Sequence, residues 1–153
     1  MMTAHAATAL ERRLPLQRDL GWQPSARTLA EIEWFAAPSV VAQLVQSGTA
    51  ASAAEGRALL QECKRFLVLT ELCRPTRLPL VSRRVDEAFR HLSLQPRVYG
   101  TFCTRFFGRY LHPWAVRLEA KGHPMTVGQF AALYADVFGE PLPQVWVDAA
   151  RAG

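Results

Sequence analysis

The chain has 153 residues, of which half are hydrophobic and a fifth are charged, and its formal net charge is +5. This length and balance are typical of one folded domain with a continuous core, and they exclude a disordered or fibrous chain. No run approaches the ~20 apolar residues that span a bilayer, and charged residues interrupt the start too early for a secretory signal. We therefore expect a cytoplasmic protein that makes no membrane contact.

The N-terminal part of the chain divides at about residue 27. Residues 1–27 are weakly patterned, with a short helix expected over 4–14, although Trp22 and Trp34 suggest that part of this region packs on the domain. Residues 28–153 are expected to form a single helical domain. The spacing of Thr28 and Glu31 fits a capping box, which predicts a helix from 28 to about 47 that Pro38 kinks or splits.

Three further helices are predicted before residue 113. Ser52 begins the longest one, over 52–73, whose apolar residues recur every three or four positions. Ser82 begins the next, which runs to about 94. Pro96 then opens a helix at a position where its missing N–H costs nothing, and we expect His112-Pro113 to close it. Its aromatic and sulfur side chains form one predicted buried face: Tyr99, Phe102, Cys103, Phe106, Phe107 and Tyr110.

The last predicted helix runs from Thr126, whose spacing to Gln129 fits a capping box, to about Phe138. A terminal turn over 144–150 is expected to pack Trp146. No alternating strand pattern and no repeat is found. The sequence therefore predicts an all-α fold, a compact single-domain bundle of five to seven helices.

Three cysteines, at 63, 73 and 103, are an odd number and have no CxxC spacing. This pattern indicates neither a disulfide framework nor a sulfur-rich zinc site. Cys63 and Cys103 lie on apolar helical faces, so we expect both to be buried as small hydrophobic side chains. No metal and no cofactor is predicted.

The excess positive charge is confined to residues 83–121. This segment holds eight basic residues and three acidic ones, whereas the other basic and acidic residues cancel. Such a segment favours an acidic partner or a polyanion, although a solvated basic helix face is the simpler explanation. The predicted partner-binding residues are Arg97, Arg105 and Arg109, of which Arg97 and Arg105 point away from the aromatic face.

An ordered frame of residues runs from about 60 to 146. It comprises Phe66 and Leu67, Pro79, Val85-Asp86-Glu87, Tyr99, Phe102-Cys103, Phe107-Gly108, His112, Phe138-Gly139 and Trp146. In this frame the chain resembles the bacterial glycine-rich-domain-containing-protein-like family, whose function is poorly defined. The resemblance implies a polar site at Asp86, Tyr99, Cys103 and His112.

The chain departs from that family pattern at the site itself. Phe89-Arg90 stands where the family has Trp-His, Leu92 and Pro96 replace a second His and a Thr, and a His-His pair is reduced to His112-Pro113. Asp86 and Arg90 are four positions apart, so we expect an ion pair between them in place of the family's Asp–His pairing. A guanidinium neither ligates metals nor transfers protons near neutral pH, so the family's chemistry is expected to be lost.

Three functions follow from these patterns. The first is a non-enzymatic helical module that binds another protein with an acidic surface, as an accessory or adaptor protein. The alternative is a metal-binding or enzymatic domain with a reduced site at Asp86, Tyr99, Cys103 and His112. A weaker alternative is nucleic-acid binding through the basic segment, because the helices over 82–94 and 97–111 resemble a helix-turn-helix in outline.

Overall fold

A computed structural model describes residues 22–74, 76, 78, 79, 82–113, 116 and 125–147 of the chain. The predicted all-α bundle is confirmed, and none of the described residues lies in a strand. The described helices are α2 (Ala26–Trp34), α3 (Pro38–Gln46), α4 (Ala53–Cys73), α5 (Arg83–Ser93), α6 (Pro96–Phe107) and α8 (Val127–Phe138). The helix expected over 4–14 lies outside the described residues.

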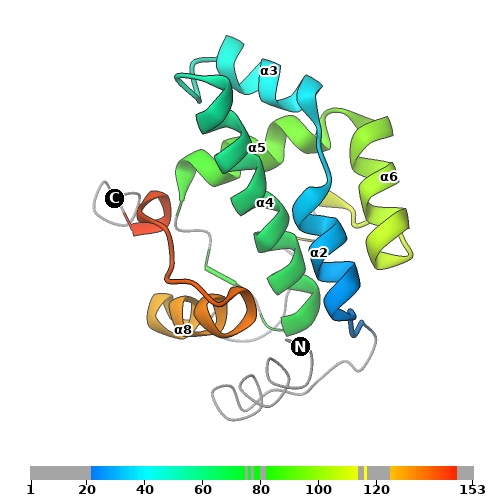
Figure 1. Ribbon diagram of the computed structural model, residues 1–153, viewed down its shortest axis with the longest axis vertical. Helices are drawn as coiled ribbons and strands as arrows, with labels where there is room; N and C mark the ends of the chain where they lie inside the picture. The colour runs from blue at the N-terminus through cyan, green and yellow to red at the C-terminus, as the bar shows by residue number, and fades with distance from the viewer. Residues whose placement is uncertain are drawn as a thin grey trace.

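The longest helix, α4, is the centre of the bundle. It packs against α2, α3 and α5, and α5 in turn packs against α3 and α6 (Figure 1). Buried residues occur on every side of α4, including the consecutive run Phe66–Leu69. From Leu59 to Cys73 no residue of α4 is exposed, so a charged side chain in this part of the helix must find a partner inside the protein.

Most predicted helix starts are confirmed. The side chains of Ser52 and Ser82 accept hydrogen bonds from the backbone N–H groups of Glu55 and Val85, both at 3.2 Å. Thr126 and Gln129 form the complete capping box at the start of α8. Pro38 splits the long segment after residue 28 and stands in the first turn of α3, where its missing N–H leaves no bond unmade. The turn around Trp146 is also helical, over the described residues 144–147.

Two predicted boundaries are wrong. The cap of α2 is Ser25, which accepts from Thr28 N at 3.0 Å, so the helix begins a turn before Thr28. The end of α6 is Phe107, because Gly108 adopts a left-handed conformation with φ +75° that stops the helix. Tyr110, predicted to be buried, is therefore beyond the helix and 47% exposed. His112 does not close α6 either, since its carbonyl accepts from Val116 N at the start of the next helical turn.

The core combines the predicted aromatic face of α6 with residues of α4, α5 and α8. Tyr99, Phe102, Cys103, Phe106 and Phe107 are all buried, as expected. Trp22 packs edge-on against Phe107 and donates from Nε1 to Phe106 O at 2.9 Å. The expected packing of the N-terminal region is thus confirmed for Trp22, but Trp34 is 86% exposed.

A glycine allows α3 and α4 to approach closely. A Cβ atom placed on Gly56 would lie 3.0 Å from Cγ1 of Val41, tighter than ordinary carbon contacts. The two helices therefore pack closely at this point.

Candidate functional site

The predicted polar site contains one close pair. Tyr99 Oη donates to the backbone carbonyl of Leu111 at 2.5 Å, and the Tyr99 hydroxyl also hydrogen-bonds with Cys103. Both side chains are buried. Burial raises the pKa of the Tyr99 phenol and of the Cys103 thiol, because a charged form has no water around it. A buried neutral thiol is a poor nucleophile, so this pair has the chemistry of a core contact.

The other residues of the predicted site lie nearer the surface. Asp86 is half-buried in the first turn of α5, and His112 is exposed, with its ring 6.3 Å from that of Tyr110. The ion contact that the structure gives Arg90 is with Glu87, at 3.9 Å between Nη1 and Oε1. The pairing of Arg90 with Asp86 stays a prediction.

Two of the three predicted partner-binding arginines already contact acids of this chain. Arg109 Nη2 lies 3.2 Å from both carboxylate oxygens of Glu71, which is buried on α4. Arg105 Nη2 lies 3.7 Å from Glu31 on α2, and its guanidinium covers the ring of Phe106. Arg97 is exposed at the start of α6. Part of the charge of the basic segment is therefore neutralised within the fold.

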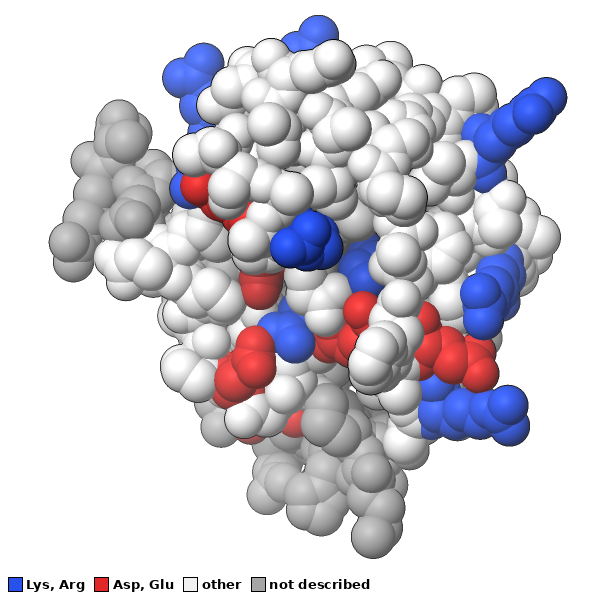
Figure 2. Space-filling model, turned by 45° about the horizontal axis from the view of Figure 1, so that its top comes forward, with Lys and Arg blue, Asp and Glu red and all other residues white. Residues whose placement is uncertain are grey.

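A groove that the sequence did not predict is lined by the end of α2, by α3 and by α4. It has a volume of about 830 Å³, and its lining comes from residues 33–38, 41–45 and 53–64. Eleven of its fifteen lining residues are apolar, among them the exposed Trp34 and Val45. The molecular surface around α3 is largely uncharged (Figure 2), and α3 itself contains no charged residue. The acidic side chains on this face of the molecule lie below that uncharged area in Figure 2. An apolar surface of this kind is typical of binding sites.

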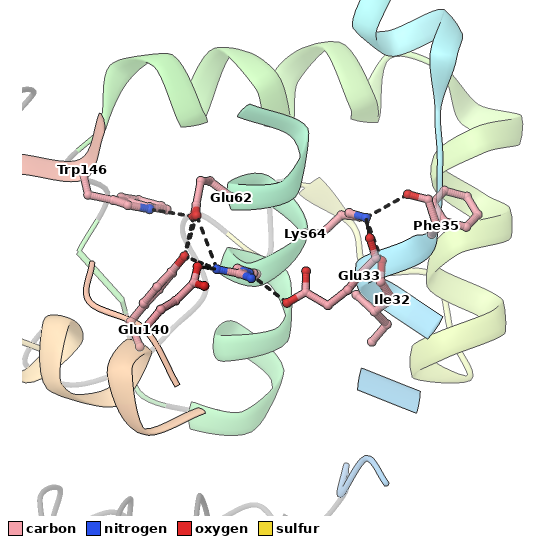
Figure 3. Close-up of polar contacts among 9 residues, drawn as sticks. Ile32, Glu33, Phe35, Glu62, Lys64, Glu140 and Trp146 are labelled. Carbon is pink, nitrogen blue, oxygen red and sulfur yellow. Dashed lines mark hydrogen bonds and ion pairs between the residues drawn. The ribbon is translucent and has the colours of Figure 1, made fainter. Parts of the chain in front are cut away.

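A buried lysine fixes one end of the groove. Lys64 Nζ donates to the carbonyls of Ile32, Glu33 and Phe35 at 2.7, 2.9 and 2.8 Å (Figure 3). These carbonyls end α2, where a cation is favoured by the helix dipole. Burial lowers the pKa of Lys64 to about 8. Because its three N–H bonds are all used, the ammonium holds α2 against α4 and is not placed as a nucleophile.

A second set of polar side chains joins α4 to α2 and to the C-terminal part of the chain (Figure 3). Arg65 contacts Glu33 through Nε at 2.9 Å, and its Nη1 contacts both Glu140 and Tyr134 Oη. Tyr134 Oη donates a hydrogen bond to Glu62 Oε2 at 2.7 Å, and Trp146 Nε1 approaches the same oxygen at 3.4 Å. Glu33 Oε2 is buried and has no hydrogen-bond partner among the described residues. We call these residues, Glu33, Glu62, Arg65, Tyr134, Glu140 and Trp146, the α4 polar network.

The Glu62 carboxyl makes the stability of the protein depend on pH. Burial raises its pKa above 4.5, against the lowering effect of the Tyr134 hydrogen bond and Arg65. The folded state then holds this proton more tightly than the unfolded state, so the contribution of Glu62 to the free energy of unfolding is fully present below pH 4.5. It is lost as the pH rises through the raised pKa.

Replacing Glu62 by glutamine should remove that dependence, since the amide oxygen still accepts from Tyr134 but does not titrate. We expect the free energy of unfolding of the wild type to fall relative to Glu62→Gln between pH 4 and pH 7, measured by urea unfolding across that range. Glu31→Gln, on the exposed side of α2, controls for the same chemical change elsewhere. A difference between wild type and Glu62→Gln that does not vary with pH would contradict the assignment.

The described residues contain neither a metal cluster nor a helix that could cross a membrane. Residues 22–74, 82–113 and 125–147 contain no group of three His, Cys, Asp or Glu side chains that could hold a metal ion. In the same part of the chain, no helix combines the length and apolar character that a membrane crossing requires. The three cysteines are free and buried, and the predicted burial of Cys63 and Cys103 is confirmed.

Comparison of the chain with family models, with curated proteins and with solved structures finds no match in any of the three.

Proposed function

We propose that this protein is a non-enzymatic helical module that binds another protein, as an accessory or adaptor protein of the cytoplasm. The observation that carries the proposal is Trp34, a large aromatic side chain that is 86% exposed beside an apolar groove of about 830 Å³. Tryptophan is enriched among the few residues that contribute most of the binding energy of protein interfaces. The groove thus supports the role. We therefore propose that the partner contacts α2, α3 and α4, and not the arginines on and after α6 that the charge distribution indicated.

Other features agree with this role. The predicted site residues Tyr99 and Cys103 are engaged in the core, and Lys64 is fully hydrogen-bonded. Neither the enzymatic or metal-binding alternative nor the nucleic-acid alternative is favoured by a specific contact of the described residues. Membership of the glycine-rich-domain-containing-protein-like family remains part of the proposal, resting on the residues that carry the resemblance.

The test compares two charge substitutions at exposed hydrophobic residues. Trp34→Asp alters the groove, whereas Leu94→Asp places the same charge at the end of α5, at a residue that is 65% exposed. Tagged wild-type protein and both variants are used to capture partners from the source cells, with quantitative mass spectrometry. The enriched protein is then purified and titrated against all three.

We expect one partner to bind the wild type and Leu94→Asp and to be lost from Trp34→Asp, with circular dichroism showing that both variants fold. Equal binding by Trp34→Asp would contradict the groove. If Arg97→Glu abolished binding and Trp34→Asp did not, the docking surface would lie on α6, as the charge distribution alone suggested.

A further inference from the structure

The two long walls of the groove have the geometry that receives a helix. The α3 wall presents Pro38, Val41, Ala42 and Val45, and the α4 wall runs from Ala53 to Lys64. At a rise of 1.5 Å per residue, these walls are roughly 10 Å and 16 Å long, which corresponds to two to three helical turns. A partner helix with apolar residues at i, i+3 or i+4 and i+7 covers the same length on one face.

The charges along the groove are unequal. Its lining contains one carboxylate, Glu33, and two cations, Arg57 and Lys64. Glu33 is paired with Arg65, and the Lys64 ammonium is bound to three carbonyls of α2. Arg57 is exposed, and the structure gives it no ion pair or hydrogen bond with any described residue. Among the described residues nothing neutralises the Arg57 cation, so a complementary partner carries a carboxylate there.

The position of Arg57 sets where that carboxylate must lie. Trp34 belongs to the end of the groove that Lys64 fixes, since Lys64 binds the carbonyls of the residues on either side of it. Arg57 precedes Lys64 by seven residues on α4, roughly 10 Å or two turns along the groove. A helix lying in the groove would thus contact Trp34 and Arg57 with residues about seven positions apart.

We propose that the groove binds an acidic amphipathic helix of a partner protein, with an acidic side chain about seven positions from the apolar residue that contacts Trp34. The inference rests on the proposed function and names the class of partner that the groove accepts. Apolar residues between these two positions lie against Val41 and Leu60, while the carboxylate pairs with Arg57 at the rim. The direction in which the partner helix lies along the groove depends on whether its acidic residue precedes or follows the apolar residue that contacts Trp34.

The experiment selects helical peptides from a displayed library on the full-length wild type, with counter-selection on Trp34→Asp. The consensus peptide is then synthesised with a fluorescent label, and its affinity is measured by anisotropy in low salt. The proteins compared are the wild type, Trp34→Ala, Arg57→Glu and the control Leu94→Asp. A second peptide carries lysine in place of the acidic residue.

We expect enriched sequences with apolar residues at i, i+3 or i+4 and i+7 and an acid at the stated distance. Trp34→Ala should weaken binding about thirtyfold, as removal of an interface tryptophan that contributes much of the binding energy does. Arg57→Glu should weaken binding of the acidic peptide about fivefold. The lysine peptide should bind Arg57→Glu without this loss, but it should not bind the wild type more tightly. Leu94→Asp should bind as the wild type does.

Three results would overturn the inference. If no peptide bound the wild type in preference to Trp34→Asp, a helix would be excluded as the occupant of the groove. The proposed function would still stand if the wild type captured a whole protein that Trp34→Asp did not. If the acidic peptide and the lysine peptide each bound Arg57→Glu as tightly as they bind the wild type, the proposed pairing of the acidic residue with Arg57 would be excluded. Sedimentation that shows a wild-type dimer and a Trp34→Asp monomer would make a second copy of this chain the occupant. Loss of both peptide binding and Trp34-dependent capture would overturn the function itself.

Discussion

Replacing Arg65 by methionine should lower the free energy of unfolding by about 1–3 kcal/mol, the cost of leaving a buried polar group without its hydrogen-bond partner. Arg65 is largely buried, with 12% of its side chain exposed, and it contacts Glu33 and Glu140 directly. Methionine fills a similar volume but supplies no donor. Glu33 and the Tyr134 hydroxyl would then remain in the interior without their cation, and that uncompensated desolvation is the source of the loss.

The measurement is urea unfolding followed by circular dichroism at pH 7. Arg27→Met is the matched control, because Arg27 pairs with Glu31 at 3.1 Å on α2 but is 89% exposed. An exposed pair four residues apart stabilises a helix by only about 0.3–0.5 kcal/mol, so this variant should unfold almost as the wild type does. Equal losses in the two variants would show that burial of the α4 polar network contributes nothing beyond a surface ion pair.

Replacing Trp146 by alanine should cost about 3–5 kcal/mol, the range measured for deletion of large aromatic side chains from protein cores. Trp146 is fully buried, with its ring 5.1 Å from that of Phe130 and 6.0 Å from that of Phe66. The substitution leaves a cavity between α4 and α8. It also removes the indole N–H that approaches the Glu62 carboxylate.

The matched control is Trp34→Ala, which deletes the same side chain where it is 86% exposed. We expect its free energy of unfolding to stay within about 0.5 kcal/mol of the wild type, as for most surface substitutions. Thermal unfolding of the three proteins measures both effects in one series. A large loss from Trp34→Ala would mean that this residue stabilises the fold, and its proposed part in binding would then lose its main support.

Helix boundaries could be predicted from the sequence where a single capping residue marks the start or the end of the helix. Ser52 and Ser82 each stand just before an apolar run, and their side chains cap the helices that follow. The errors arose where two local signals competed. Ser25 and Thr28 both carry a capping hydroxyl, and the aromatic spacing of α6 continues to Tyr110 although Gly108 stops the helix. The hydrophobic period alone does not report the left-handed residue that ends a helix.

The groove and the α4 polar network could not be predicted in the same way. Glu33 and Glu140 come from segments that are far from Arg65 in the sequence, and only the tertiary fold brings them to it. One signal was nevertheless present. Apolar residues occupy every side of the segment that forms α4, so charged residues within it could not all reach solvent. That pattern indicates that charged groups such as Glu62 and Lys64 are buried and hydrogen-bonded, without naming their partners.

The three hydrogen bonds of Lys64 also determine how any partner would meet this protein. They fix the end of α2, and with it the backbone on both sides of Trp34, in a single arrangement before anything binds. The conformational entropy of this wall is therefore lost during folding and not during association, which is the property called preorganisation. A rigid wall of this kind places most of the difference between good and poor partners in the rate at which they dissociate.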